Sequence, residues 1–300
     1  MTAGAFEPPE VVAVLWALAT MGVRADRGLL EALGRRAAST VRTYTTHEVV
    51  EVLWALAVMG RGADGILGVL RDRLAARVLQ SRATLSSSHK CRVHQWLLSC
   101  ELNMAPGAPL PRSVARVKQE MGEECLLAFL GQRTHESRLQ QKVAAFLASV
   151  VPDEFEIVEE YLDPRSGLSI DILVRPRSAC KVTPVILHGV APPESPAAGL
   201  NATAPVRHGA SSCALRAHIP TAGSTGGVTS LDSDVEWAVE VDGPTHFLGM
   251  TRTPSAKTLL KRKRLGQLGY TMVPVPFFEW RALKGEAARR RYLADKLRGG

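Results

Sequence analysis

The stretch Trp237-Ala-Val-Glu-Val-Asp-Gly-Pro-Thr-His-Phe247 decides the fold of the C-terminal half of the chain. Apolar residues alternate along 237–242, which is the period-2 pattern of a strand with one buried face. The Gly-Pro pair that follows predicts a turn. Glu240 and Asp242 therefore project from the same side of the strand's end, and His246 comes just past the turn. Two carboxylates and an imidazole gathered there predict a metal site, a ligand site or an anchored loop.

Two earlier segments supply partners for this strand. Ser169-Ile-Asp-Ile-Leu-Val174 predicts a second strand with Asp171 between apolar neighbours, and residues 136–147 predict an amphipathic helix. Nucleases that hold a divalent ion between adjacent strands present their acidic groups in the same order. The simpler interpretation is that Glu240 and Asp242 only accept hydrogen bonds from backbone amides around the turn.

An internal repeat occupies the N-terminal part. Residues 11–22 return, mostly unchanged, as residues 49–60, at a spacing of 38. Thr45-x-x-Glu48 predicts a capping box at the start of the second copy, and Gly22 and Gly60 stand where helix-ending glycines belong. Each copy is followed by a second helical pattern. Helix pairs at this period predict an α-solenoid.

Tryptophans mark the repeat, and a decayed third copy is expected to start near residues 94–98, with Trp96 at a spacing of 42 from Trp54. Trp16 and Trp54 are expected in the core of the repeats, with base stacking as the lesser alternative.

Composition divides the remaining chain. We expect helical repeats over 1–105, a Pro-rich linker with a helix over 106–135, and an α/β domain over 136–300. Within this domain, a hairpin is expected at about 154–175. A strand at 270–276 is placed near the sheet edge by its prolines. The Pro-, Gly- and Ser-rich segment at about 177–234 predicts a disordered insertion.

The net charge of +8 is concentrated near the C-terminus. Lys and Arg occupy positions 252, 257, 261, 262, 263, 264, 281, 284, 289, 290, 291, 296 and 298, against Glu279, Glu286 and Asp295. A localised basic surface favours a polyanionic partner, with a solvated helical surface as the alternative.

Other classes are disfavoured by composition. The five cysteines form no CxxC pair, so neither a disulfide framework nor a zinc ribbon is expected, and a reducing compartment fits. No apolar run reaches the length of a membrane span. No secretory or transit signal is visible at the start, which leaves either a cytoplasmic protein or an incomplete gene model.

The C-terminal segments together resemble a RAP domain, a module found at the end of many organellar RNA-binding proteins. The matching pieces, in order, are SRLQQKV (137–143), SIDI (169–172), VEVDGPTHF (239–247), TLLKRKRL (258–265), GY (269–270), VPVP (273–276), EW (279–280) and YL (292–293). The 38-residue repeats resemble octotricopeptide and FAST-kinase-like helical repeats.

The resemblance implies an α+β protein in which the helical repeats precede a restriction-endonuclease-like α/β domain. It also implies a role in organellar RNA processing, stability, ribosome biogenesis or translation, in a chloroplast or mitochondrion. Asp171, Glu240 and Asp242 would form the acidic pocket. Where the nuclease motif places a lysine this chain has Asp242, so Lys257 or Lys261 of the following helix would have to supply it.

Three functions follow. The first is RNA binding without chemistry, to a single-stranded organellar transcript or ribosomal RNA, alone or within a ribonucleoprotein complex. The residues expected to carry it are Arg252, Lys257, Lys261, Arg262, Lys263, Arg264, His246 and Trp280. The second is a Mg²⁺-dependent endoribonuclease, with Asp171 and Glu240 as metal ligands, Asp242 as a further catalytic residue that acts as ligand or base, and His246 assisting. The third is a protein-interaction scaffold.

Overall fold

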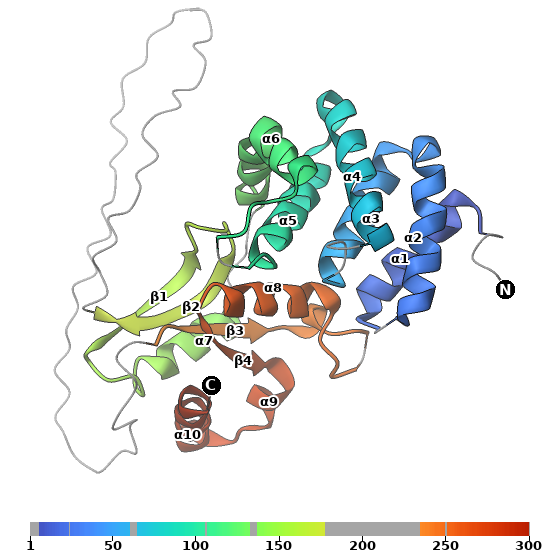
Figure 1. Cartoon of the computed structure of the whole chain (residues 1–300). Helices are drawn as coiled ribbons and strands as arrows, with labels where there is room; N and C mark the ends of the chain where they lie inside the picture. The colour runs from blue at the N-terminus through green and yellow to red at the C-terminus, as the bar shows by residue number, and fades with distance from the viewer. Residues whose placement is uncertain are drawn as a thin grey trace, which may run out of the picture.

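The computed structural model describes residues 6–23, 25–60, 65–105, 107–132, 137–177, 235–249 and 251–299. These residues are mostly helical, with a helical region followed by a small mixed sheet and its covering helices (Figure 1). Residues 178–234, nearly all of the predicted insertion, lie outside the described residues. No helix in the described ranges is long and apolar enough to cross a bilayer.

The helical region consists of helix pairs stacked in two layers. The pairs are α1 (Pro8–Met21) with α2 (Arg27–Thr40), α3 (Thr46–Val58) with α4 (Gly65–Gln80), and α5 (Ser87–Leu102) with α6 (Arg112–Leu130). Helices α1, α3 and α5 lie side by side in one layer, and α2, α4 and α6 form the other. The chain therefore buries each pair against its neighbour, as the repeat predicts.

Local signals in the repeat act as expected. The Thr45 hydroxyl accepts a hydrogen bond from the Glu48 amide at 3.3 Å, and the Glu48 carboxylate accepts one from the Thr45 amide at 2.7 Å. This reciprocal pair confirms the capping box. Gly22 and Gly60 adopt positive φ angles of 65° and 64° just past α1 and α3, a conformation that favours glycine.

Two expectations about the repeat are wrong. The third pair begins at Ser87, earlier than expected, because Ser86 caps α5 just as Thr45 caps α3. Trp16 is 44% exposed, because it lies at the border of the stripe of α1 that buries Leu15 and Ala19. The sequence repeat therefore marks the helices correctly but not which tryptophan they bury.

The sheet has the strand order β1-β2-β3-β4. Its strands are β1 (Phe155–Leu162), β2 (Ser169–Pro176), β3 (Trp237–Asp242) and β4 (Thr271–Pro276). Strands β1, β2 and β3 pair antiparallel in succession, whereas β3 and β4 run parallel. The predicted hairpin and the Pro-containing edge strand are both confirmed.

The alternation along β3 separates two apolar cores. Val239 and Val241 pack on one face of the sheet with α7 (Arg138–Leu147), α9 (Phe277–Ala282) and α10 (Gly285–Arg298). Ala238 packs on the opposite face with Leu265 of α8 (Ala256–Gln267) and Leu98 of α5. The helical region and the sheet thus share a core on the α8 face.

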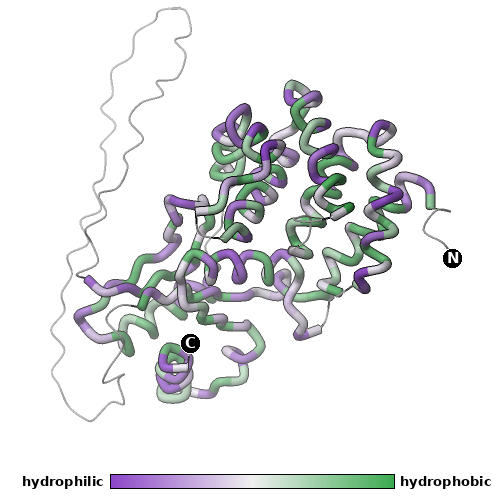
Figure 2. The backbone as a smooth tube through the Cα atoms, viewed as in Figure 1, coloured by the Kyte–Doolittle hydropathy of each residue, from purple (hydrophilic) through white to green (hydrophobic). Residues whose placement is uncertain are grey.

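Helix α8 lies between the sheet and the ends of α1, α3 and α5 (Figure 1). Figure 2 shows that this helix is rich in hydrophilic residues despite its position between packed elements. Its polar side chains must therefore find partners inside the protein, and these partners build the site.

Candidate nucleic-acid interface and buried acidic pocket

The parallel pairing of β3 and β4 brings the carboxyl ends of both strands to one edge, where Asp242 lies opposite Pro276. Ligands of open α/β sheets bind outside such carboxyl ends. A cavity of about 1000 Å³ opens near this edge. Asp171, Glu240 and Lys261 are among its lining residues, and α5 and α6 contribute Gln95 and Phe129.

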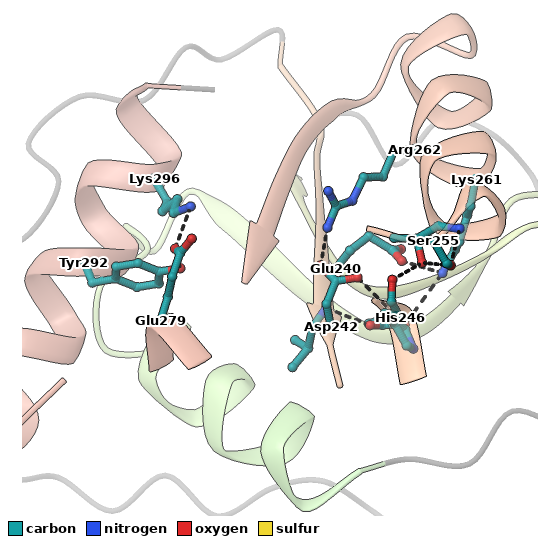
Figure 3. Close-up of polar contacts among 12 residues, drawn as sticks. Glu240, Asp242, His246, Ser255, Lys261, Arg262, Glu279, Tyr292 and Lys296 are labelled. Atoms are coloured by element: carbon teal, nitrogen blue, oxygen red, sulfur yellow. Dashed lines mark hydrogen bonds and ion pairs between the residues drawn. The ribbon is translucent and has the colours of Figure 1, made fainter. Parts of the chain in front are cut away.

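Asp171, Glu240 and Lys261 form the charged centre of this cavity. The Lys261 Nζ lies 2.5 Å from Glu240 Oε2 and 3.8 Å from Asp171 Oδ1. The other Asp171 oxygen accepts a hydrogen bond from the Val241 amide at 2.8 Å. Figure 3 shows Lys261 reaching from α8 toward the Glu240 carboxylate of β3. The sequence order of the acids thus brings Asp171 and Glu240 together, and α8 places the lysine against them.

The pKa values of Glu240, Asp171 and Lys261 are all shifted by burial and by their mutual charges. Burial, opposed by Lys261, raises the pKa of Glu240 to about 7. It also raises the pKa of Asp171, again against the pull of Lys261. Burial alone would lower the pKa of Lys261, but Glu240 and Asp171 outweigh it and raise that pKa instead. The ammonium therefore stays charged, and two carboxylates share it.

Asp242 belongs to a separate arrangement, although it lies two residues from Glu240. It is fully buried and forms an ion pair with Arg262 of α8. Its Oδ1 also lies 2.9 Å from His246 Nδ1. The imidazole and the guanidinium thus fix the end of β3 and the turn after it, which is the anchored-loop interpretation.

These residues do not fit a divalent ion in the described arrangement. The ammonium of Lys261 lies against both Asp171 and Glu240, where a shared metal ion would have to bind, and Asp242 is engaged elsewhere. Among the described residues, no group of three or more His, Cys, Asp or Glu side chains is placed to hold a metal ion.

The basic helix α8 directs several of its cations inward. Arg264 is 2% exposed, donates hydrogen bonds to Ser99 Oγ at 3.1 and 2.6 Å, and also bonds the Gln95 carbonyl oxygen. Burial lowers the pKa of Arg264 to about 9, so the guanidinium remains charged at neutral pH. Lys257 and Lys263 are exposed. The expectation that Arg264 contacts RNA needs correction, because its guanidinium binds α5 instead of facing solvent.

Trp280 also lies inside the protein. Its side chain is 3% exposed and packs edge-on against Phe146 at a ring-centroid distance of 5.6 Å. Arg289 lies over both rings. The expectation that Trp280 contacts RNA is not met in this structure, since its ring joins α9 to α7 in the core.

An arginine–aromatic cluster at the same sheet edge was missed from the sequence. Phe277 and Phe278 begin α9 directly after β4, and Phe247 follows the β3 turn; their ring centroids lie 5.3 to 5.9 Å apart. Arg252 lies 5.0 Å from the Phe278 centroid, and Arg281 lies 5.2 Å from that of Phe277. The Phe-Phe pair next to a strand end was the available signal, but it does not show which arginines cover it.

The fold and site define an α/β domain with charged and aromatic groups at the carboxyl ends of two parallel strands, joined to a helical region. The family model of the RAP domain matches residues 239–296, which confirms the predicted resemblance for that segment. A relative from Oryza sativa subsp. japonica, "RAP domain-containing protein, chloroplastic", is 37% identical over 60 residues. The similarity covers 20% of this chain and 9% of that relative. A RAP domain supports a nucleic-acid-binding role for this segment.

Proposed function

We propose that this protein binds single-stranded RNA through the arginine–aromatic cluster of Phe247, Arg252, Phe277, Phe278 and Arg281. The observation that carries the proposal is the position of two exposed guanidiniums over half-buried phenyl rings at the sheet edge. Guanidiniums bind phosphates, and both they and aromatic rings stack on unpaired bases. Neither arginine has an acidic partner among the described residues.

Exposed cations nearby extend this surface. Lys257 lines the cavity beside the pocket, and Lys284 follows α9. In the described residues these lysines have no carboxylate partner, so both are available for phosphate. An RNA strand held at the edge would continue along them by charge attraction that is independent of sequence.

The cellular setting of this binding is part of the proposal. We place it in a chloroplast or mitochondrion, in transcript processing or stability, ribosome biogenesis or translation, on a transcript or ribosomal RNA. The support is the RAP domain and the printed name of the rice relative. We also propose that the repeats are of the octotricopeptide or FAST-kinase-like type, on the basis of the stacked helix pairs. We propose an endonuclease-like fold for the sheet domain, on the basis of the order of its acidic strands. Microscopy of a fluorescent fusion of the full-length protein tests the location.

The test is RNA binding by fluorescence anisotropy at several salt concentrations. Replacing Arg252 and Arg281 by Ala together is expected to weaken binding roughly tenfold and to reduce the salt slope by about 1.4, the value for two lost contacts to a single strand. The matched control is Arg27→Ala with Arg116→Ala, which removes the same charge from exposed arginines paired with Glu31 and Glu120. An equal loss of RNA affinity in both double variants would show that only net charge matters, and it would reject the cluster as the binding site.

The other functions become outcomes of the same experiments. Cleavage of the RNA in Mg²⁺, lost in Asp171→Ala, would establish the ribonuclease alternative. Absence of RNA binding, together with capture of a partner that resists nuclease treatment, would favour the scaffold.

A further inference from the structure

We propose that Lys261 is the resident cation of the Asp171–Glu240 pocket, so that the protein binds no divalent ion there and loss of this ammonium opens a divalent-cation site. The inference goes beyond RNA binding at the sheet edge, because it concerns a different set of residues. It identifies a latent site for a hard ion such as Mg²⁺ or Mn²⁺.

The position of the ammonium is the first observation. Lys261 Nζ is 2.5 Å from Glu240 Oε2 and 3.8 Å from Asp171 Oδ1, so it lies against both carboxylates. A divalent ion bridging the same oxygens would meet a positive charge within a few ångströms. The burial of Glu240 strengthens that repulsion.

An oxygen without a partner is the second observation. Glu240 is 3% exposed, and its Oε1 is buried with no hydrogen-bond partner among the described residues. An unsatisfied buried carboxylate oxygen is costly, and a cation is the ligand that would satisfy it. The pocket therefore has more acceptor capacity than one ammonium uses.

The surrounding space suits a hydrated ion. The cavity of about 1000 Å³ reaches Asp171, Glu240, Ser255 and Thr258. Mg²⁺ keeps several waters and needs only one or two carboxylates from the protein. Two carboxylates beside a cavity with room for several waters meet this need once the ammonium is gone.

Charge balance gives the direction of the effect. Two carboxylates and one ammonium leave one net negative charge, and a divalent ion would turn this into a net positive charge. In Lys261→Met the two carboxylates would be neutralised by the ion. A buried site favours the neutral sum, so the variant is expected to bind the ion and the wild type is not.

Mn²⁺ binding to the full chain tests the inference by calorimetry and by electron paramagnetic resonance, at about pH 8 so that carboxylates ionise. The wild type is expected to show no saturable binding at this site up to roughly millimolar Mn²⁺. Lys261→Met is expected to bind one ion at least about tenfold more tightly. Adding Glu240→Gln to Lys261→Met should abolish that gain.

Lys257→Met is the matched control for Mn²⁺ binding. It removes the same charge from an exposed residue of the same helix and cavity, and it should leave the Mn²⁺ affinity unchanged. If Lys261→Met unfolds because its carboxylates are left unpaired, thermal unfolding of it and of Lys261→Gln with and without Mn²⁺ becomes the readout, and stabilisation by Mn²⁺ in these variants alone supports the proposal. Equal Mn²⁺ affinity in wild type and Lys261→Met, or no binding and no stabilisation in either variant, would overturn it. These results do not depend on RNA affinity.

Discussion

Asp163 is held both by neighbours in sequence and by one residue far along the chain. Asp163, at the turn between β1 and β2, is 1% exposed and accepts hydrogen bonds from the Ser166 amide at 2.9 Å, the Ser166 hydroxyl at 2.6 Å and the Tyr270 hydroxyl at 2.8 Å. Burial would raise its pKa, but these hydrogen bonds and Arg165 outweigh it, and the pKa falls below the ordinary value of 3.8. The carboxylate form is therefore part of the folded structure.

Asp163→Asn should lower the free energy of unfolding by roughly 1–3 kcal/mol at neutral pH, since charge-assisted hydrogen bonds are lost. A depressed pKa contributes stability that is fully present above the unfolded pKa and is lost as pH falls through the folded one. The gap between variant and wild type should therefore shrink below about pH 4. Urea unfolding at several pH values measures it, and a gap independent of pH would contradict this explanation.

The sequence predicts which residues meet where both of them lie on recognisable strands. Asp171 and Glu240 were expected to meet and do, and Lys261 was one of two lysines named for the missing position. By contrast, the helix carrying Arg264 has no sequence signal showing that α5 would cover one side of it. Whether the acidic residues and exposed cations act as a functional site stays a prediction.

Secondary-structure elements form where local signals are strongest. The capping box at Thr45, the glycines after α1 and α3 and the alternation along β3 were all readable, because each depends on neighbours a few residues apart. The start of α5 was misplaced because the third repeat keeps the cap but loses the apolar motif. Segment boundaries such as 105 and 135 stay predictions, although α6 packs against α4 and α5.

Thr45→Ala should destabilise the protein by about 1 kcal/mol, because it leaves the amide of Glu48 without its side-chain partner at the start of α3. Chemical unfolding followed by circular dichroism measures the loss. Thr46→Ala is the neighbouring control and should change stability far less. Equal effects of the two substitutions would show that the cap contributes nothing specific.

At the scale of the whole molecule, the cations of the basic C-terminal segment divide into those paired within the protein and those left at the surface. Lys261, Arg262 and Arg264 are engaged inside the protein, where α8 meets the sheet and α5. Lys296 pairs with Glu279, and Arg290 pairs with Glu286. Net charge alone therefore overstates the surface that a polyanion would meet, and composition could not reveal this division.

Arg264→Ala should weaken the attachment of α8 to the helical region by roughly 2–4 kcal/mol, since Ser99 and the Gln95 carbonyl each lose a charged donor. Because both parts share a core, unfolding monitored by tryptophan fluorescence and by circular dichroism should shift together. Lys263→Ala, one residue away and exposed, is the control. Two separated transitions in the wild type would show that the parts fold independently.

The matched segment 239–296 starts inside β3 and therefore leaves out β1 and β2, which complete the sheet. A fragment cut at that boundary would leave the β2 side of β3 with bare amides and carbonyls, a template for pairing with other chains. Such a fragment should self-associate into β-rich aggregates, whereas a fragment that retains β1 and β2 keeps that side covered. The family match thus marks the most recognisable piece of this sheet, but not the smallest piece that folds without aggregating.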